Sequence, residues 1–183
     1  MKTAFRALTA SLAASMMSAA LAGTPPLAPA EVAAAAPAGT SLLTFKSSVT
    51  QAHAYAVAVY QTAPDQDGVR YRSLIIFGAK DGKFIPEVTS DKLIACSKCS
   101  PIHDDPFAFS HLILAPGHIH IDQMAAGREP SVVILDFAYK QGKWYVTRAE
   151  RELWADVGRY KSATERLPLP KSGLVQDLSL IHI

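Results

Sequence analysis

The side chains that could do chemistry are concentrated in residues 96–107, where two cysteines, a histidine and two aspartates interrupt a series of strand-like segments. Cys96 and Cys99 form a C-x-x-C pair, and cysteines of exported proteins are normally oxidised. We therefore expect a disulfide between Cys96 and Cys99 that stiffens the following loop. Because binding residues are commonly carried on loops, this loop is a candidate partner-binding surface, made of His103, Asp104, Asp105 and Phe107.

The same cysteine pair has two alternative interpretations. A thiol–disulfide exchange site needs a thiol activated at a helix N-terminus, whereas Pro101 and strand-like segments follow Cys99 here. A zinc site needs two ligands besides the cysteines, and these could come from His103, His118 or His120. A disulfide remains the expectation, because a single C-x-x-C motif is weak support for either alternative.

A second candidate site is a face of a predicted hairpin that turns at Pro116 and Gly117. If residues 109–114 pair with residues 118–122, a period of two places four polar side chains on one face and four aliphatic side chains on the other. The polar face consists of His111, His118, His120 and Asp122, and the aliphatic face consists of Leu112, Leu114, Ile119 and Ile121. Three imidazoles could hold zinc and leave a position for water, which would support a metal-dependent activity. The simpler interpretation is a solvated face of an amphipathic hairpin.

Alternation of apolar and polar residues predicts that these sites are carried by a single all-β, mainly antiparallel domain, either a sandwich or a twisted meander. Strands are expected over residues 52–60, 70–77, 83–88, 109–114, 118–122, 131–139 and 144–148. In the first of these, alanines occupy one face, which suggests close approach of a second layer, while His53, Tyr55, Val57 and Val59 occupy the other. Pro86 cannot donate to a strand ladder, so its strand should lie at an edge or carry a bulge. Val133, Leu135, Phe137 and Tyr139 share one face and should be core.

Two segments near the C-terminus differ from this pattern. Residues 150–166 are rich in charge and place four apolar residues at helical spacing, which predicts a short helix; these are Leu153, Trp154, Val157 and Tyr160. Residues 178–183, Leu-Ser-Leu-Ile-His-Ile, resemble the peptide obtained when sequencing-adapter DNA is translated. We therefore expect an artefactual tail there and assign no role to His182.

The N-terminal residues predict export. Lys2 and Arg6 precede an apolar run that ends in a small-residue cleavage site at Ala22, so residues 1–22 are interpreted as a signal peptide. Residues 23–40 contain four prolines and almost no large apolar side chain, which is typical of a linker. The β-rich domain is then expected over residues 41–177, in the periplasm or outside the cell.

Charge and hydropathy limit the classes of partner. Removing residues 1–22 removes two of the 18 basic residues and none of the 16 acidic ones, so the rest of the chain has balanced charge. Balanced charge gives no long-range attraction to nucleic acid, and no later apolar run is long enough for a stable membrane span. The sequence also contains no G-x-S-x-G elbow, P-loop, dinucleotide fingerprint or H-E-x-x-H motif.

The segment from Ser73 to Arg148 resembles a set of bacterial exported proteins of unassigned function. Their shared pattern is an apolar strand, C-x-x-C, D-P-F, an alternating hairpin, F-x-Y and W-[YF]-[LV]. The matching residues are Leu74 to Phe77, Cys96, Cys99, Asp105 to Phe107, Phe137 to Tyr139 and Trp144 to Val146. The chain departs from the pattern at Ser100, where a glycine is common, and at Ala126-Gly127-Arg128, where the others have Gly-Gly-Ser. The resemblance implies an exported β-protein and carries no activity with it.

Together these observations predict an exported, non-catalytic protein that needs no cofactor and binds or inhibits an envelope protein or binds a small ligand. The loop at residues 96–107 would be the contact surface. The alternative is a metal-dependent enzyme or zinc-binding protein that uses His111, His118, His120 and Asp122.

Overall fold

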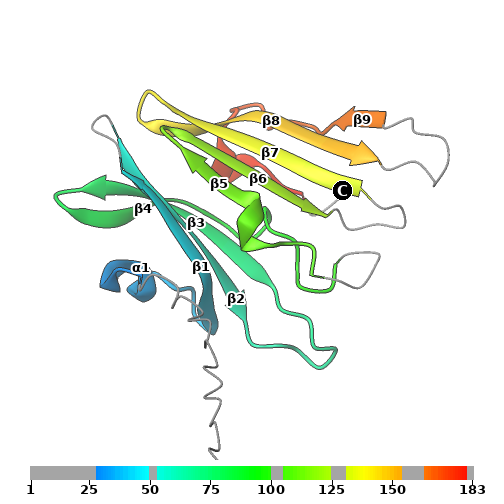
Figure 1. Cartoon of the computed structure of the whole chain (residues 1–183), viewed down its shortest axis with the longest axis horizontal. Helices are drawn as coiled ribbons and strands as arrows, with labels where there is room; N and C mark the ends of the chain where they lie inside the picture. Colours follow the sequence, from blue (N-terminus) through cyan, green and yellow to red (C-terminus); the bar gives the residue numbers. More distant parts are fainter. Residues whose placement is uncertain (1–27, 50–52, 100–104, 125–130, 154–162, 181–183) are drawn as a thin grey trace, which may run out of the picture.

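Two antiparallel β-sheets form the structure, a computed structural model that describes residues 28–49, 53–99, 105–124, 131–153 and 163–180 (Figure 1). The first sheet contains, in spatial order, β1 (Thr40–Val49), β2 (Ala54–Thr62), β3 (Arg72–Lys80) and β4 (Lys83–Ser90). The second contains β5 (Leu112–Ala115), β6 (His118–Met124), β7 (Ser131–Lys140), β8 (Lys143–Leu153) and β9 (Ala163–Arg166). Spatial order follows chain order in both sheets, so each is a meander. The predicted antiparallel all-β fold is confirmed.

A hydrophobic core lies between the two sheets and contains side chains from both. Strand β2 contributes Tyr55, Val57 and Val59, all fully buried, on the face that the sequence predicted. Strand β7 contributes Val133, Leu135 and Phe137 as predicted, whereas Tyr139 is only partly buried and packs at the edge of this core. The alternation in both strands therefore marks the faces that meet.

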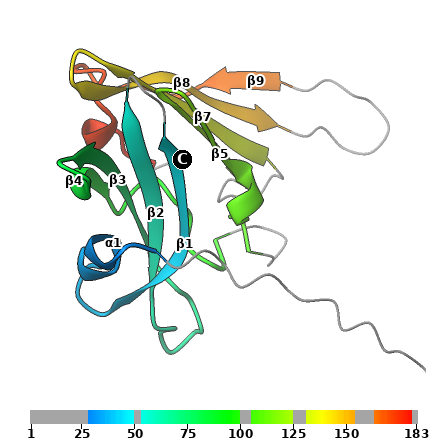
Figure 2. The same cartoon turned by 60° about the vertical axis from the view of Figure 1, so that its left-hand side comes forward.

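The alanine face of β2 lies against a third layer on the other side of the first sheet (Figure 2). This layer is α1 (Ala30–Ala34), whose Val32 is 0% exposed and packs with Ala56 and Ala58. The Tyr60 hydroxyl donates a hydrogen bond of 2.6 Å to the Val32 carbonyl. Small side chains on β2 thus allow the close approach that the sequence suggested. The expectation of a linker over residues 23–40 is corrected for the described residues 28–40, which fold onto the sheet and begin β1.

Tight turns join neighbouring strands where the sequence carries Gly. Asp81 and Gly82 have φ values of 51° and 75°, and Gln141 and Gly142 have 49° and 78°. Positive φ at both central residues is the geometry of the type I′ hairpin turn, which suits the twist of paired strands. Pro86 lies on β4, the last strand of its sheet, beside a register shift between Ile76 and Phe77. The prediction of an edge strand or a bulge is confirmed in both parts.

Side-chain hydrogen bonds link the two sheets around the core. Lys46 Nζ on β1 donates to the Leu112 carbonyl at 2.6 Å. The Tyr55 hydroxyl on β2 lies 2.6 Å from each of two carbonyls at the β5–β6 turn, those of Ala115 and His118. Trp144 Nε1 on β8 donates to Glu87 Oε2 on β4 at 3.0 Å. These contacts fix how one sheet lies on the other.

The C-terminal part of the chain differs from its prediction. Residues Glu150 to Leu153 belong to β8 and Ala163–Arg166 forms β9, so the ends of the predicted helix are strands. Trp154, Val157 and Tyr160 lie outside the described residues, and the helical element near this end is a 3-10 turn, Val175–Asp177. Leu178 is 2% exposed within the shared core and Leu180 packs against it. Of the helices in the described ranges, none is long and apolar enough to cross a membrane.

Candidate functional site

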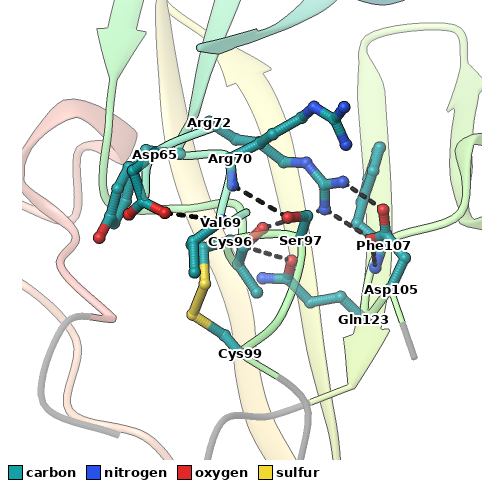
Figure 3. The surroundings of a disulfide bond; sticks show 12 residues. Asp65, Val69, Arg70, Arg72, Cys96, Ser97, Cys99, Asp105, Phe107 and Gln123 are labelled. Carbon is teal, nitrogen blue, oxygen red and sulfur yellow. Dashed lines mark hydrogen bonds and ion pairs between the residues drawn. A yellow bond between two sulfur atoms is a disulfide. The ribbon is translucent and has the colours of Figure 1, made fainter. Parts of the chain in front are cut away.

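The predicted disulfide between Cys96 and Cys99 is present, with the two Cα atoms 5.2 Å apart (Figure 3). The pair closes a turn in which the Cys99 N–H donates to the Cys96 carbonyl at 3.2 Å. Ser97 holds this turn against the chain that leads into β3: its N–H donates to the Arg70 carbonyl at 3.0 Å, and its hydroxyl accepts from the Arg70 N–H at 2.9 Å. The disulfide turn is therefore attached to the first sheet and is not a free loop.

An ion pair between a buried arginine and a half-exposed aspartate lies beside the disulfide turn (Figure 3). The Arg72 side chain is 1% exposed, and its two terminal nitrogens contact the two carboxylate oxygens of Asp105, one of them at 2.7 Å. Arg72 Nη1 also donates to the Ala95 carbonyl at 3.1 Å, and Asp105 accepts from the Phe107 N–H at 3.0 Å. The two parallel contacts with the Asp105 carboxylate neutralise the positive charge of the Arg72 guanidinium, which β3 places in the interior.

The environment of Asp105 favours its charged form. Desolvation opposes ionisation, but the hydrogen bonds from Arg72 and from the Phe107 N–H, together with the charges of Arg72 and Arg70, outweigh it. The pKa of Asp105 is consequently held below its ordinary value of 3.8. Asp105 is thus ionised at neutral pH, as the buried guanidinium requires.

Gln123 on β6 holds the chain segment that follows β4. It is 4% exposed, its Oε1 accepts from the Ala95 N–H at 2.9 Å, and its Nε2 donates to the Leu93 carbonyl at 2.7 Å. A buried amide that is satisfied on both sides acts as a rigid bridge, because breaking either bond would leave a buried polar group unpaired. Gln123 therefore fixes the segment around Leu93 and Ala95 to the second sheet.

A cavity of about 350 Å³, called here the corner pocket, opens between these fixed segments. Its apolar wall includes Leu93, Ile94, Met124, Val133 and Leu180, and the disulfide closes one side. Its lining residues are Tyr71, Arg72, Asp91, Lys92, Leu93, Ile94, Ala95, Cys96, Cys99, Gln123, Met124, Val133 and Leu180. Apolar walls with a few polar groups are typical of ligand-binding sites.

The predicted partner-binding loop is only partly brought to this site. Asp105 lies beside the pocket and is committed to Arg72. Phe107 is 5% exposed in the shared core, with the Arg72 Cζ atom 5.8 Å from its ring centroid, so the expectation that Phe107 is a surface contact is corrected. Its aromatic side chain is apolar and gains more from burial than from solvent contact. His103 and Asp104 lie outside the described residues.

The predicted hairpin register is confirmed, because Leu112 pairs with Ile121 and Leu114 pairs with Ile119. Two histidines of its other face lie beside carboxylates, and both are close to Asp122. His111 Nδ1 lies 2.5 Å from Asp122 Oδ1, and His120 Nδ1 lies 2.6 Å from Asp136 Oδ1. His120 Nε2 is 3.7 Å from Asp122 Oδ2, and His118 is exposed.

This arrangement brings His111, His120 and Asp122 side by side, but the described side chains do not form a metal site. Within the ranges that the structure describes, no group of three or more His, Cys, Asp or Glu side chains is placed to hold a metal. Asp136, on β7 directly opposite His120, is a partner that the sequence analysis missed. Its side chain is positioned to orient the imidazole through a hydrogen bond.

Sequence reasoning also missed Arg72 and Gln123, although a signal for both was present. Arg72 lies two residues before Leu74 and four before Ile76, so it shares their buried face of the strand. Gln123 shares the buried face of Ile119 and Ile121 for the same reason. A polar side chain on the buried face of a strand must find partners there.

We found no match for the chain among protein-family models, curated proteins or solved structures. The geometry of the corner pocket is therefore the basis for a functional hypothesis.

Proposed function

We propose that the chain is an exported, non-catalytic binding protein whose corner pocket receives part of a partner in the periplasm or outside the cell. The observation that carries the proposal is the cavity of about 350 Å³ with apolar walls beside the disulfide turn. This volume falls in the range of ligand sites, roughly 300–1,000 Å³. Burial of apolar surface from a partner would supply the binding free energy.

The walls of the pocket are fixed before a partner arrives, which favours binding. The disulfide, the ion pair between Arg72 and Asp105, and the Gln123 bridge hold three different segments around the cavity. A preformed site loses little conformational entropy on association. Phe107 supports the site from the core and does not touch a partner in this proposal.

The chemistry of the pocket suits binding better than catalysis. Both cysteines are joined in a disulfide, and they lie in a turn instead of at the start of a helix, where a thiol would be activated. The polar side chains deepest in the site, Arg72 and Gln123, are bonded to other parts of the chain. A disulfide at this position also supports export to an oxidising compartment.

Site-specific photocrosslinking tests the proposal. Tyr71 lines the pocket and is 57% exposed, so replacing it by a photoreactive phenylalanine analogue places the probe at the pocket mouth. Ile85 on β4 is 46% exposed and does not line the pocket, so the same replacement there is a matched control. Both full-length proteins would be expressed in a bacterial host that exports them, and irradiated before lysis.

We expect a discrete adduct from position 71 that is absent from position 85. Absence of an adduct from both positions, or the same adducts from both, would contradict binding at the corner pocket. Recovery of both proteins in the cytoplasm, with residues 1–22 retained, would contradict export.

A further inference from the structure

The corner pocket already borders a leucine of the chain's own C-terminal segment. Leu178 has extended backbone angles, φ −76° and ψ 133°, and is 2% exposed in the shared core. Two residues later, Leu180 lines the pocket, and its N–H donates to the Lys92 carbonyl at 3.3 Å. In an extended chain, residues i and i+2 point to the same side. Leu178 thus packs in the core beside the pocket, while Leu180 lines the pocket and one backbone hydrogen bond joins it to the rim.

The charges at the pocket are balanced. Asp91 and Lys92 carry opposite charges and both line the cavity, and the Arg72 guanidinium is neutralised by Asp105. A site for a strongly anionic or cationic head group would present an excess of the opposite charge. This rim suits a neutral backbone with aliphatic side chains.

The hydrogen-bonding groups of the pocket also fit a peptide backbone. Gln123 uses one acceptor position on the Ala95 N–H and one donor on the Leu93 carbonyl, which fixes its side chain in the wall. The Lys92 carbonyl accepts a backbone N–H, that of Leu180. A main-chain acceptor at the rim that takes a backbone N–H is a contact that an extended peptide can make.

We infer that the corner pocket recognises an extended peptide segment that carries a leucine-like side chain, and that Leu180 occupies part of the peptide's path. This inference rests on the proposed function and specifies its partner. The packing of Leu180 shows that a leucine side chain fits beside the pocket, and this holds even if residues 178–183 are an artefactual tail. Because Leu180 blocks part of the path, the chain's own segment lowers the fraction of molecules that can bind, and with it the apparent affinity.

Fluorescence anisotropy with synthetic peptides tests the inference. The probe is a labelled peptide with the sequence of residues 174–180, and its control has serine in place of both leucines that correspond to Leu178 and Leu180. The proteins are the disulfide-bonded wild type, Leu180→Ser, which removes the competing side chain, and Ala95→Leu, which adds volume inside the cavity. Met124→Gln is a second wall variant in case Ala95→Leu does not fold, and circular dichroism checks all four proteins.

We expect the leucine peptide to bind at least about tenfold more tightly than the serine peptide. Leu180→Ser should tighten binding of the leucine peptide by about fivefold, and the folded wall variant should weaken it by at least about tenfold. Equal binding of the two peptides, or no tightening in Leu180→Ser, would overturn the inference.

Decanoate is included as a competing aliphatic ligand without a peptide backbone. Binding of decanoate to wild type but not to the wall variant, with no binding of either peptide, would also overturn the inference and leave the proposed function standing. An absent crosslink at Tyr71 would instead remove the proposed function itself.

Discussion

Arg72 and Asp105 join strand β3 of the first sheet to the chain that leads into the second, through an ion pair with very unequal burial. The Arg72 side chain is 1% exposed and the Asp105 side chain is 49% exposed. The guanidinium therefore depends on this carboxylate, while the carboxylate is still partly solvated. Loss of the anion should cost more than loss of a surface pair and less than loss of a fully buried one.

Asp105→Asn should lower the free energy of unfolding by about 2 kcal/mol, because it leaves a buried cation without its counter-charge. Urea denaturation monitored by tryptophan fluorescence measures this change. Glu165→Gln is the matched control, because Glu165 is 58% exposed and its oxygen is 3.8 Å from Arg151. The control should change stability by less than about 0.5 kcal/mol. Equal effects of the two substitutions would contradict the structural role of Asp105.

The same carboxylate predicts how stability depends on acid. Its pKa in the folded protein lies below the ordinary value of 3.8, so the unfolded chain binds a proton more readily. The stabilisation from Asp105 is therefore fully present above the unfolded pKa and is lost as the pH falls through the folded pKa. Urea denaturation from about pH 5 to about pH 3 should show a steeper fall for wild type than for Asp105→Asn. Parallel curves would contradict the shift.

The sequence predicts the strands best where large and small side chains alternate. The faces of β2, β7 and the β5–β6 hairpin are correct, because Tyr55, Leu135 and Ile119 have to meet in one interior. Strand β1 was not predicted, since Thr40–Val49 is an edge strand whose residues are half-buried or exposed and show little alternation. The helical spacing over residues 150–166 misled at its two ends, where residues 150–153 belong to β8 and Ala163–Arg166 forms the edge strand β9, whose exposed charged residues need no buried face.

The corner pocket was beyond sequence reasoning because its parts come from distant segments. The cysteine turn was identified, yet its partners Arg70 and Arg72 lie more than 20 residues earlier, and Gln123 lies more than 20 residues later. Such contacts depend on how the two sheets are placed on one another, which periodicity within one strand does not determine. The sequence analysis placed Phe107 on the surface because the composition of a loop does not indicate which of its side chains point into the core.

Tyr60 should titrate at unusually high pH. Burial raises the pKa of Tyr60 to about 12, because the ionised phenolate would lose its solvation under α1. The unfolded chain loses this proton near the ordinary value of 10.0, so the contribution of Tyr60 to stability falls as the pH rises from 10.0 toward 12. Tyrosinate absorbance should show a late step that is smaller in Tyr60→Phe, where the remainder comes from Tyr55 and Tyr139, whose pKa values burial also raises. Tyr71→Phe is the control, because Tyr71 is 57% exposed and its loss should leave that late step in place.

Zinc should not bind at the histidine face. His111 and His120 each place Nδ1 beside a carboxylate, at 2.5 Å and 2.6 Å. Among the described residues, no group of three or more His, Cys, Asp or Glu side chains is placed to hold a metal. After equilibration with zinc and buffer exchange, elemental analysis should find no difference between wild type and the double variant His118→Ala, His120→Ala. Chelation should leave the thermal midpoint of both proteins unchanged. Loss of one zinc per chain in the double variant would contradict this expectation.

Replacing both cysteines by serine should lower the free energy of unfolding by about 2 kcal/mol, the entropy expected for a closed loop of about four residues. The disulfide also holds the pocket wall that Ser97 attaches to Arg70, so the double variant should bind the leucine peptide more weakly than wild type. Reduced wild type is the matched control and should behave like the double variant in both measurements. Unchanged peptide binding in a folded, disulfide-free protein would show that the cysteine turn does not shape the pocket. In that case the Gln123 bridge and the ion pair between Arg72 and Asp105 would be sufficient to hold it.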